Sequence, residues 1–180
     1  VIYKKLWIKL KIQPAFPATA DYRREVIYSV VTMAIFALNA FVLLSTSVRS
    51  YTKIYDNISE RGYAYFVFSI VVSIFIHDTY FYWAHRIMHH PKIFKWIHLV
   101  HHRSINPSPW ASHAFHPVEA FIEAGVVIVI VFLVPIHPFA ILAFLMFMML
   151  YNVYGHLGYE FFPKWLMRSS LGKWFNTSTN

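Results

Sequence analysis

Hydrophobic residues fall into three long stretches along the chain, with short polar segments between them. Residues 26–48 contain no charged side chain, and residues 62–77 contain none either. Because about 20 consecutive apolar residues let a helix cross a bilayer, each of these stretches predicts a membrane-spanning helix. The second helix is expected to continue to His90. The polar residues 50–61 form a short loop, so the two helices are predicted to be an antiparallel hairpin.

The third stretch, residues 118–159, is apolar apart from two glutamates and two histidines. It is too long for one helix, and Pro135 and Pro138 interrupt it. Two shorter helices that form a second hairpin are therefore predicted. The predicted fold class is all-α, a multi-pass membrane helical bundle of two hairpins.

The other segments are expected to lie at the membrane surface. Residues 1–25 mix aromatic, apolar and basic side chains and contain two helix-breaking prolines. Residues 92–102 predict a surface helix, and residues 161–180 predict a second interfacial segment. We expect one membrane domain over residues 1–180, truncated at both ends. Its parts are residues 1–25, 26–90, 91–117 and 118–180.

The composition supports a membrane protein. Hydrophobic residues make up 58% of the 180 residues, charged residues 13%, and the mean hydropathy is +0.46. A soluble helical protein with a large apolar core is the alternative, but a domain this small needs more polar surface. The chain has no cysteine, which excludes disulfides, thiolate metal sites and a cysteine nucleophile. Any metal must therefore be bound through nitrogen or oxygen.

The net charge of +8 does not indicate nucleic-acid binding, because the basic residues do not form one patch. Several of them precede the first apolar stretch, which is typical of a cytoplasmic flank. They are Lys4, Lys5, Lys9, Lys11, Arg23 and Arg24. The first hairpin then returns the chain to the same side at His85 and His89, so a cytoplasmic-side, histidine-rich site is predicted.

Two histidine clusters carry the candidate chemistry. His85 and His89 are four residues apart, and His98 is three and four residues from His101 and His102. On a helix such positions share a face, and imidazole is costly in apolar surroundings unless something binds it. We interpret the clusters as metal ligands. Five imidazoles exceed what one tetrahedral zinc needs, so a two-metal site is the simplest explanation.

Other residues are candidates by their position. Asp78 falls on the helical stripe of His85 and His89, so it is predicted to orient a ligand histidine; a helix-end charge facing water is the alternative. His156 ends the last apolar helix, and the second hairpin returns it to the cluster side as an expected ligand. His90, His113 and His116 are possible ligands or outer-shell groups, with helix capping before Pro117 as the alternative for the last two. His77 is read as an interfacial polar group and His137 as a loop residue.

Four segments resemble one known family. Residues 78–89 resemble the first histidine box of the fatty acid hydroxylase / sterol desaturase superfamily, and residues 98–102 resemble its second box. Residues 111–117 are similar to a segment of the sterol C-5 desaturases, and residues 152–160 to a recurring family segment.

The resemblance implies a membrane-bound non-haem di-iron oxidoreductase with two Fe ions. Such enzymes act in lipid biosynthesis and use dioxygen and two reducing equivalents to hydroxylate or desaturate a lipid at a C–H bond. The lipid is a sterol or a fatty acyl chain. The resemblance also implies an electron donor such as cytochrome b5 or ferredoxin with its reductase. The expected membrane is the endoplasmic reticulum in a eukaryote and the inner membrane in a bacterium. By position, the metal ligands would be His85, His89, His98, His101, His102 and His156.

The family also carries a third histidine box near its C-terminal end. Residues 174–180 resemble the lead-in to that box, which is expected to follow in the parent protein, and activity depends on it. Two other classes stay open. A bis-histidine haem protein would leave pairs such as His101 and His102 unexplained. A metal-binding or transport module would place ionisable residues along a path through the membrane, whereas here they gather at one side.

Overall fold

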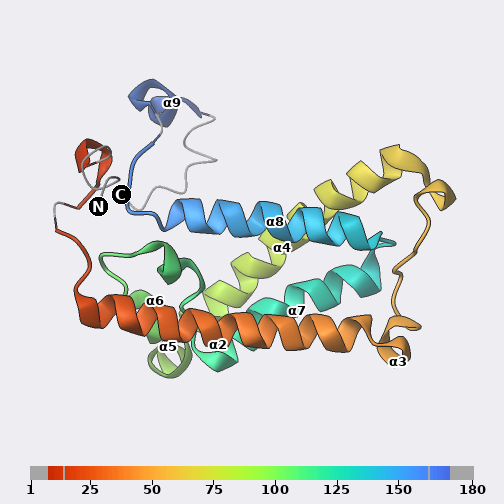
Figure 1. The fold of residues 1–180 in the computed structure, drawn as a ribbon, viewed down its shortest axis with the longest axis horizontal. Coiled ribbons are helices and arrows are strands. Elements are labelled where there is room, and N and C mark those ends of the chain that lie inside the picture. The colour runs from red at the N-terminus through yellow and green to blue at the C-terminus, as the bar shows by residue number, and fades with distance from the viewer. Residues whose placement is uncertain (1–7, 14, 162, 171–180) are drawn as a thin grey trace.

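The computed structural model describes residues 8–13, 15–161 and 163–170, and its regular elements in this part are all helical (Figure 1). Two isolated bridges, Lys11 with Tyr159 and Ile54 with Ile136, are the β-type contacts in these ranges. The predicted all-α fold class is therefore confirmed. The expectations for residues 1–7 and for the third-box lead-in at residues 174–180 lie outside the described residues.

Within the described ranges, three helices are long and apolar enough to cross a membrane: α2 (Thr19–Leu44), α4 (Gly62–Met88) and α8 (Pro138–Gly155). The helix α7 (Pro117–Leu133) has 17 residues, and a short turn joins it to α8. Within the described residues α7 packs mainly against α2 and α4, and α8 against α4 and η3 (Pro109–His113). Short helices occupy the connections. They are η1 (Ile8–Leu10), α3 (Thr46–Arg49), η2 (Ile58–Glu60), α5 (Pro91–Ile97), α6 (Leu99–His102), η3 (Pro109–His113) and α9 (Lys164–Arg168).

A His-Pro pair begins three of the helices. Proline suits the first helical position because its fixed φ is already helical and because an N–H at that position would have no partner within the helix. The preceding histidine accepts a hydrogen bond from the free backbone N–H two residues on. His90 accepts from Lys92, His116 from Val118 and His137 from Phe139, at 3.3, 3.3 and 3.1 Å.

The bundle is built around α7, which packs against α2 and α4, while α8 packs against α4. Buried apolar side chains from the later part of α7, the turn after it and α8 form the main core, and Leu43 of α2 joins them. At the other end η3 packs against both α2 and α8. The apolar core thus occupies one end of the bundle, and η3 closes the other.

The two hairpin turns meet at one end of the molecule. Lys53 donates its backbone N–H to Val131 at 2.8 Å, and Ile136 donates to Lys53 at 3.2 Å. At the opposite end Ile12 donates to Gly158 at 3.0 Å, so residues 8–13 lie beside the chain that follows α8. The histidine clusters at the end of α4 and in α6 lie at this second end (Figure 1).

Two predicted boundaries were wrong. Residues 92–102 do not form one helix, because α5 and α6 are separated at His98, which turns inward and is buried. The first long helix begins at Thr19 rather than after residue 25. Its polar first turns bind η3 and the preceding loop: Ser29 donates to the Trp110 carbonyl at 2.6 Å, and buried Glu25 accepts from the Ser108 backbone N–H at 3.1 Å.

Candidate metal centre

Four histidines from three neighbouring segments meet at one end of the bundle. His85 and His89 share a face at the end of α4, His98 stands between α5 and α6, and His102 ends α6. One ring nitrogen of each lies within 4.8 Å of those of the other three. The Nε2 atoms of His85 and His89 are 3.0 Å apart, and those of His89 and His102 are 3.2 Å apart.

This geometry fits a metal ion. Nitrogens bound at about 2.1 Å in a tetrahedron lie roughly 3.4 Å from one another, close to the separations of the Nε2 atoms. His98 Nε2 is buried and has no hydrogen-bond partner among the described residues. A buried polar atom without a partner costs stability, and a metal ion at this point would supply one. The donor set is imidazole nitrogen, which suits iron, zinc and copper.

Glu119, in the first turn of α7, orients His98. Its Oε1 lies 2.6 Å from His98 Nδ1, and both side chains are only 1% exposed. Because the carboxylate accepts, Nδ1 carries the proton and the Nε2 lone pair is free to bind metal. The orienting carboxylate predicted from the sequence was Asp78. Instead, the described hydrogen bond of Asp78 is to His77 at 3.4 Å, and its side chain is 69% exposed.

A second histidine group lies beside the first. The rings of His101 and His156 are 5.3 Å apart, and buried His101 Nδ1 has no hydrogen-bond partner in the described part of the chain. His156 Nδ1 donates to the Asn152 carbonyl at 2.8 Å, which leaves its Nε2 as an acceptor. The Ser112 hydroxyl donates to the Pro109 carbonyl and therefore accepts from His113 Nδ1, at 2.8 Å in both cases.

Several of the nearby imidazoles have lowered pKa values, which favours the neutral form that metal binding needs. Burial first, and then His156 and the other nearby imidazoles, together lower the pKa of His101 to about 3. Burial, with a smaller contribution from His156, lowers the pKa of His113 to about 4. The pKa values of His89 and His102 are also lowered, first by burial and then by His98.

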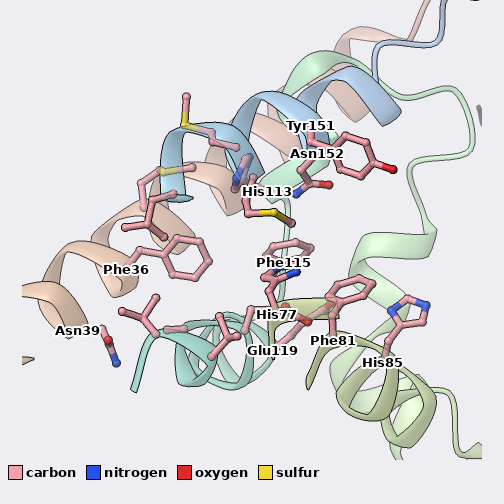
Figure 2. A pocket seen from close by; sticks show the side chains of 18 of the residues that line it. Phe36, Asn39, His77, Phe81, His85, His113, Phe115, Glu119, Tyr151 and Asn152 are labelled. Atoms are coloured by element: carbon pink, nitrogen blue, oxygen red, sulfur yellow. The ribbon is translucent and has the colours of Figure 1, made fainter. Parts of the chain in front are cut away.

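The histidines open onto a cavity of about 510 Å³ that runs between α2, α4, α7 and α8. Its walls are mainly apolar, with phenylalanine, methionine, valine and leucine side chains. Figure 2 shows His85 at one end of this space and Phe36 and Asn39 toward the other. Glu119 and His113 lie between them. The site therefore joins a cluster of side chains that could bind a metal ion to a chamber suited to an apolar molecule.

The other candidate histidines have structural contacts. His90 and His116 cap α5 and α7 through Nδ1. His77 stacks on Phe81, with ring centroids 5.8 Å apart, and lines the cavity. His137 lies in the turn before α8, as predicted, and is buried there. Glu119 and Glu123 were not among the residues predicted from the sequence, although a carboxylate within an apolar stretch is itself a signal of function.

The fold and the site define a class: a multi-pass helical membrane protein with a histidine cluster that fits a metal ion at the end of an apolar cavity. The profile of the fatty acid hydroxylase family matches residues 70–180. The chain belongs to this family.

Curated relatives resemble the chain over part of its length. It is 34% identical to the lathosterol oxidase of Homo sapiens over 117 residues, which are 64% of this chain and 39% of that protein. It is 40% identical to a Delta(7)-sterol 5(6)-desaturase of Gibberella zeae over 88 residues, 49% of this chain and 27% of that protein. A Delta(7)-sterol 5(6)-desaturase of Aspergillus fumigatus is 34% identical over 135 residues, 74% of this chain and 38% of that protein. The chain thus spans less than half the length of these relatives. No solved structure matches it.

Proposed function

We propose that this chain belongs to a membrane-bound oxidoreductase that uses dioxygen to hydroxylate or desaturate a lipid at a C–H bond. The lipid would be a sterol or a fatty acyl chain. One observation carries the proposal: four clustered histidines meet at the end of an apolar cavity between helices that could span a membrane. The names of the relatives, sterol desaturases and a lathosterol oxidase, support it.

The metal we propose is iron, with two ions. His85, His89, His98 and His102 would hold one ion, and His101 and His156 would contribute to the second. When bound, iron supplies the redox chemistry that activates dioxygen. The family resemblance supports the choice of iron over zinc or copper, since imidazole ligands alone suit all three metals.

The chain's own residues would orient the histidine ligands, bind the lipid and exclude water. Glu119 keeps the proton of His98 on Nδ1, and the Asn152 carbonyl does the same for His156. The apolar walls hold the lipid and keep bulk water from the site. Reduction requires an electron donor such as cytochrome b5 or ferredoxin with its reductase, which would dock on the histidine side. We propose that this side faces the cytoplasm. The membrane would be the endoplasmic reticulum in a eukaryote or the inner membrane in a bacterium.

The test is metal and product analysis of the intact protein purified from membranes. We expect bound iron and, with a reductant, a hydroxylated or unsaturated lipid that forms only when dioxygen is supplied. If hydroxylation occurs, ¹⁸O₂ should label the product. His137→Ala, at the far end of the bundle, is the matched control for His98→Ala and should keep its iron. Absence of metal, turnover without oxygen, or a Soret band from haem would contradict the proposal.

A further inference from the structure

A second carboxyl on α7 faces the cavity without any part in the metal site. Glu123 lies one helical turn after Glu119 and lines the same space, as does Asn39 of α2. No described residue forms a hydrogen bond with either side chain. Tyr80 interacts electrostatically with Glu123, but its hydroxyl donates to the Ile122 carbonyl at 2.7 Å. Both polar groups are therefore open to whatever occupies the cavity.

The directions of α7 and α2 determine where Glu123 and Asn39 lie relative to the histidines. Glu123 is four residues beyond Glu119, about 6 Å farther along α7, and Glu119 contacts His98. The helices α2 and α7 run in the same direction, away from the histidine end (Figure 1). Ile35 packs with Ala120, so Asn39 stands about one turn beyond that contact, as Glu123 does. Figure 2 shows Asn39 on the side of the cavity away from His85.

Polar groups at membrane depth are costly and typically mark a substrate path. An amide donates and accepts hydrogen bonds, and a carboxyl group can do both when it is protonated. A hydroxyl is their natural partner, because it also donates and accepts. An anionic carboxylate or phosphate head group fits poorly, since Glu119 and Glu123 are both acidic. The cavity thus favours an uncharged lipid with a hydroxyl group.

We propose that Glu123, with Asn39 beyond it, forms a subsite that binds a hydroxyl of the lipid. This inference rests on the proposed function and names its substrate class. When the hydroxyl of a lipid binds at Glu123, the lipid carbons that lie a few bonds from that hydroxyl are placed toward the histidines. The ring hydroxyl of a sterol meets this condition, whereas the head group of a long-chain fatty acid is many bonds from its mid-chain carbons. The subsite therefore selects a hydroxylated ring lipid.

The test measures binding rather than turnover. Dehydroergosterol, a fluorescent sterol with a free hydroxyl, and its acetate are titrated against the protein in phosphatidylcholine nanodiscs, with energy transfer from tryptophan as the signal. We expect the free sterol to bind about tenfold more tightly than the acetate, as the loss of one buried hydrogen bond predicts. Glu123→Leu should remove this preference, Glu123→Gln should keep part of it, and Asn39→Leu should reduce it.

Val127→Leu alters the same wall without a polar atom and should keep the preference, so it is the matched control. Unchanged metal content shows that each variant is folded. Competition with cholestanol and 1-octadecanol separates a ring hydroxyl from a chain hydroxyl, and stronger displacement by octadecanol would overturn the sterol class. Equal binding of the two sterols, or a preference that survives in Glu123→Leu, would overturn the subsite and leave the proposed function intact. Failure to bind any lipid would count against both.

Discussion

His98 and His137 are both buried histidines, at opposite ends of the same bundle, and they differ in how their nitrogens are used. His137 is 6% exposed; its Nδ1 accepts from the Phe139 backbone, and its Nε2 donates to the Asp56 carbonyl at 3.0 Å. His98 is 1% exposed; its Nδ1 is bound by Glu119, but its buried Nε2 has no partner among the described residues.

The difference separates a structural histidine from a ligand candidate. Burial alone does not distinguish them, and neither does proximity to aromatic rings, which both have. The distinguishing feature is the nitrogen that remains without a partner, because folded proteins rarely leave a buried polar atom unsatisfied. Around His98 three more imidazoles direct a nitrogen to the same point. Around His137 the partners are backbone groups of the two hairpin turns.

Replacement of His98 gives the largest expected effect. His98→Ala should lower metal affinity by more than about 100-fold, because even loss of an outer-shell partner costs about 10- to 100-fold. His137→Ala makes the same chemical change at the other end and should leave metal content unaltered. Metal per protein, measured by mass spectrometry after dialysis against a chelator, checks both variants. Equal metal loss from the two would show that the comparison is wrong.

The carboxylate beside His98 should come next in effect. Glu119→Gln removes the charge that favours the Nδ1–H form of His98, so metal affinity should fall about 10- to 100-fold. Glu123→Gln is the matched control, because it makes the same change one turn along α7, where no ligand histidine is in contact. Competition with a calibrated chelator gives both affinities. An unchanged affinity in Glu119→Gln would mean that the carboxylate does not orient the ligand.

The pattern of apolar residues was enough to predict much of the fold. Long uncharged stretches predict α2 and α4, and the prolines before α8 predict the break between α7 and α8. The start of α2 could not be predicted, because Arg23, Arg24 and Glu25 look like residues outside the membrane. Glu25 is instead buried against the loop before η3, through a contact 83 residues away along the chain.

The site was predictable only as far as helical spacing extends. Spacing grouped His85 with His89, and His98 with both His101 and His102. The structure brings His85, His89, His98 and His102 together, whereas the ring of His101 lies beside that of His156. It could not find Glu119, which is 21 residues from His98 and on another helix. Asp78 was chosen because it shares the stripe of His85, but a shared stripe does not establish a hydrogen bond. Long-range partners depend on packing, which a single helix does not reveal.

The lowered pKa values predict a weak pH dependence of metal binding. Three imidazoles with ordinary pKa values would together weaken binding about 30-fold between pH 7 and pH 6, through proton competition. The pKa values of His89, His101 and His102 are lowered, so these rings carry fewer protons at pH 6 than ordinary imidazoles and have fewer to release. We therefore expect a loss clearly smaller than about 30-fold, with affinity falling steeply only as the pH approaches the folded pKa values. Chelator competition at the two pH values checks this, and a 30-fold loss would contradict the burial argument.

The smallest effect should come from a gentle change at His137. Asn caps helices well through its side-chain oxygen, so His137→Asn should keep the bond from the Phe139 N–H and lose the one to the Asp56 carbonyl. We expect it to lower the free energy of unfolding by about 1 kcal/mol, against about 2 kcal/mol for His137→Ala, which loses both. Chemical unfolding in detergent measures the difference, and hydrogen exchange at the Ile136 amide reports whether the two turns stay paired. If His137→Asn released metal instead, His137 would belong with the ligand candidates, and the contrast between the two ends would not hold.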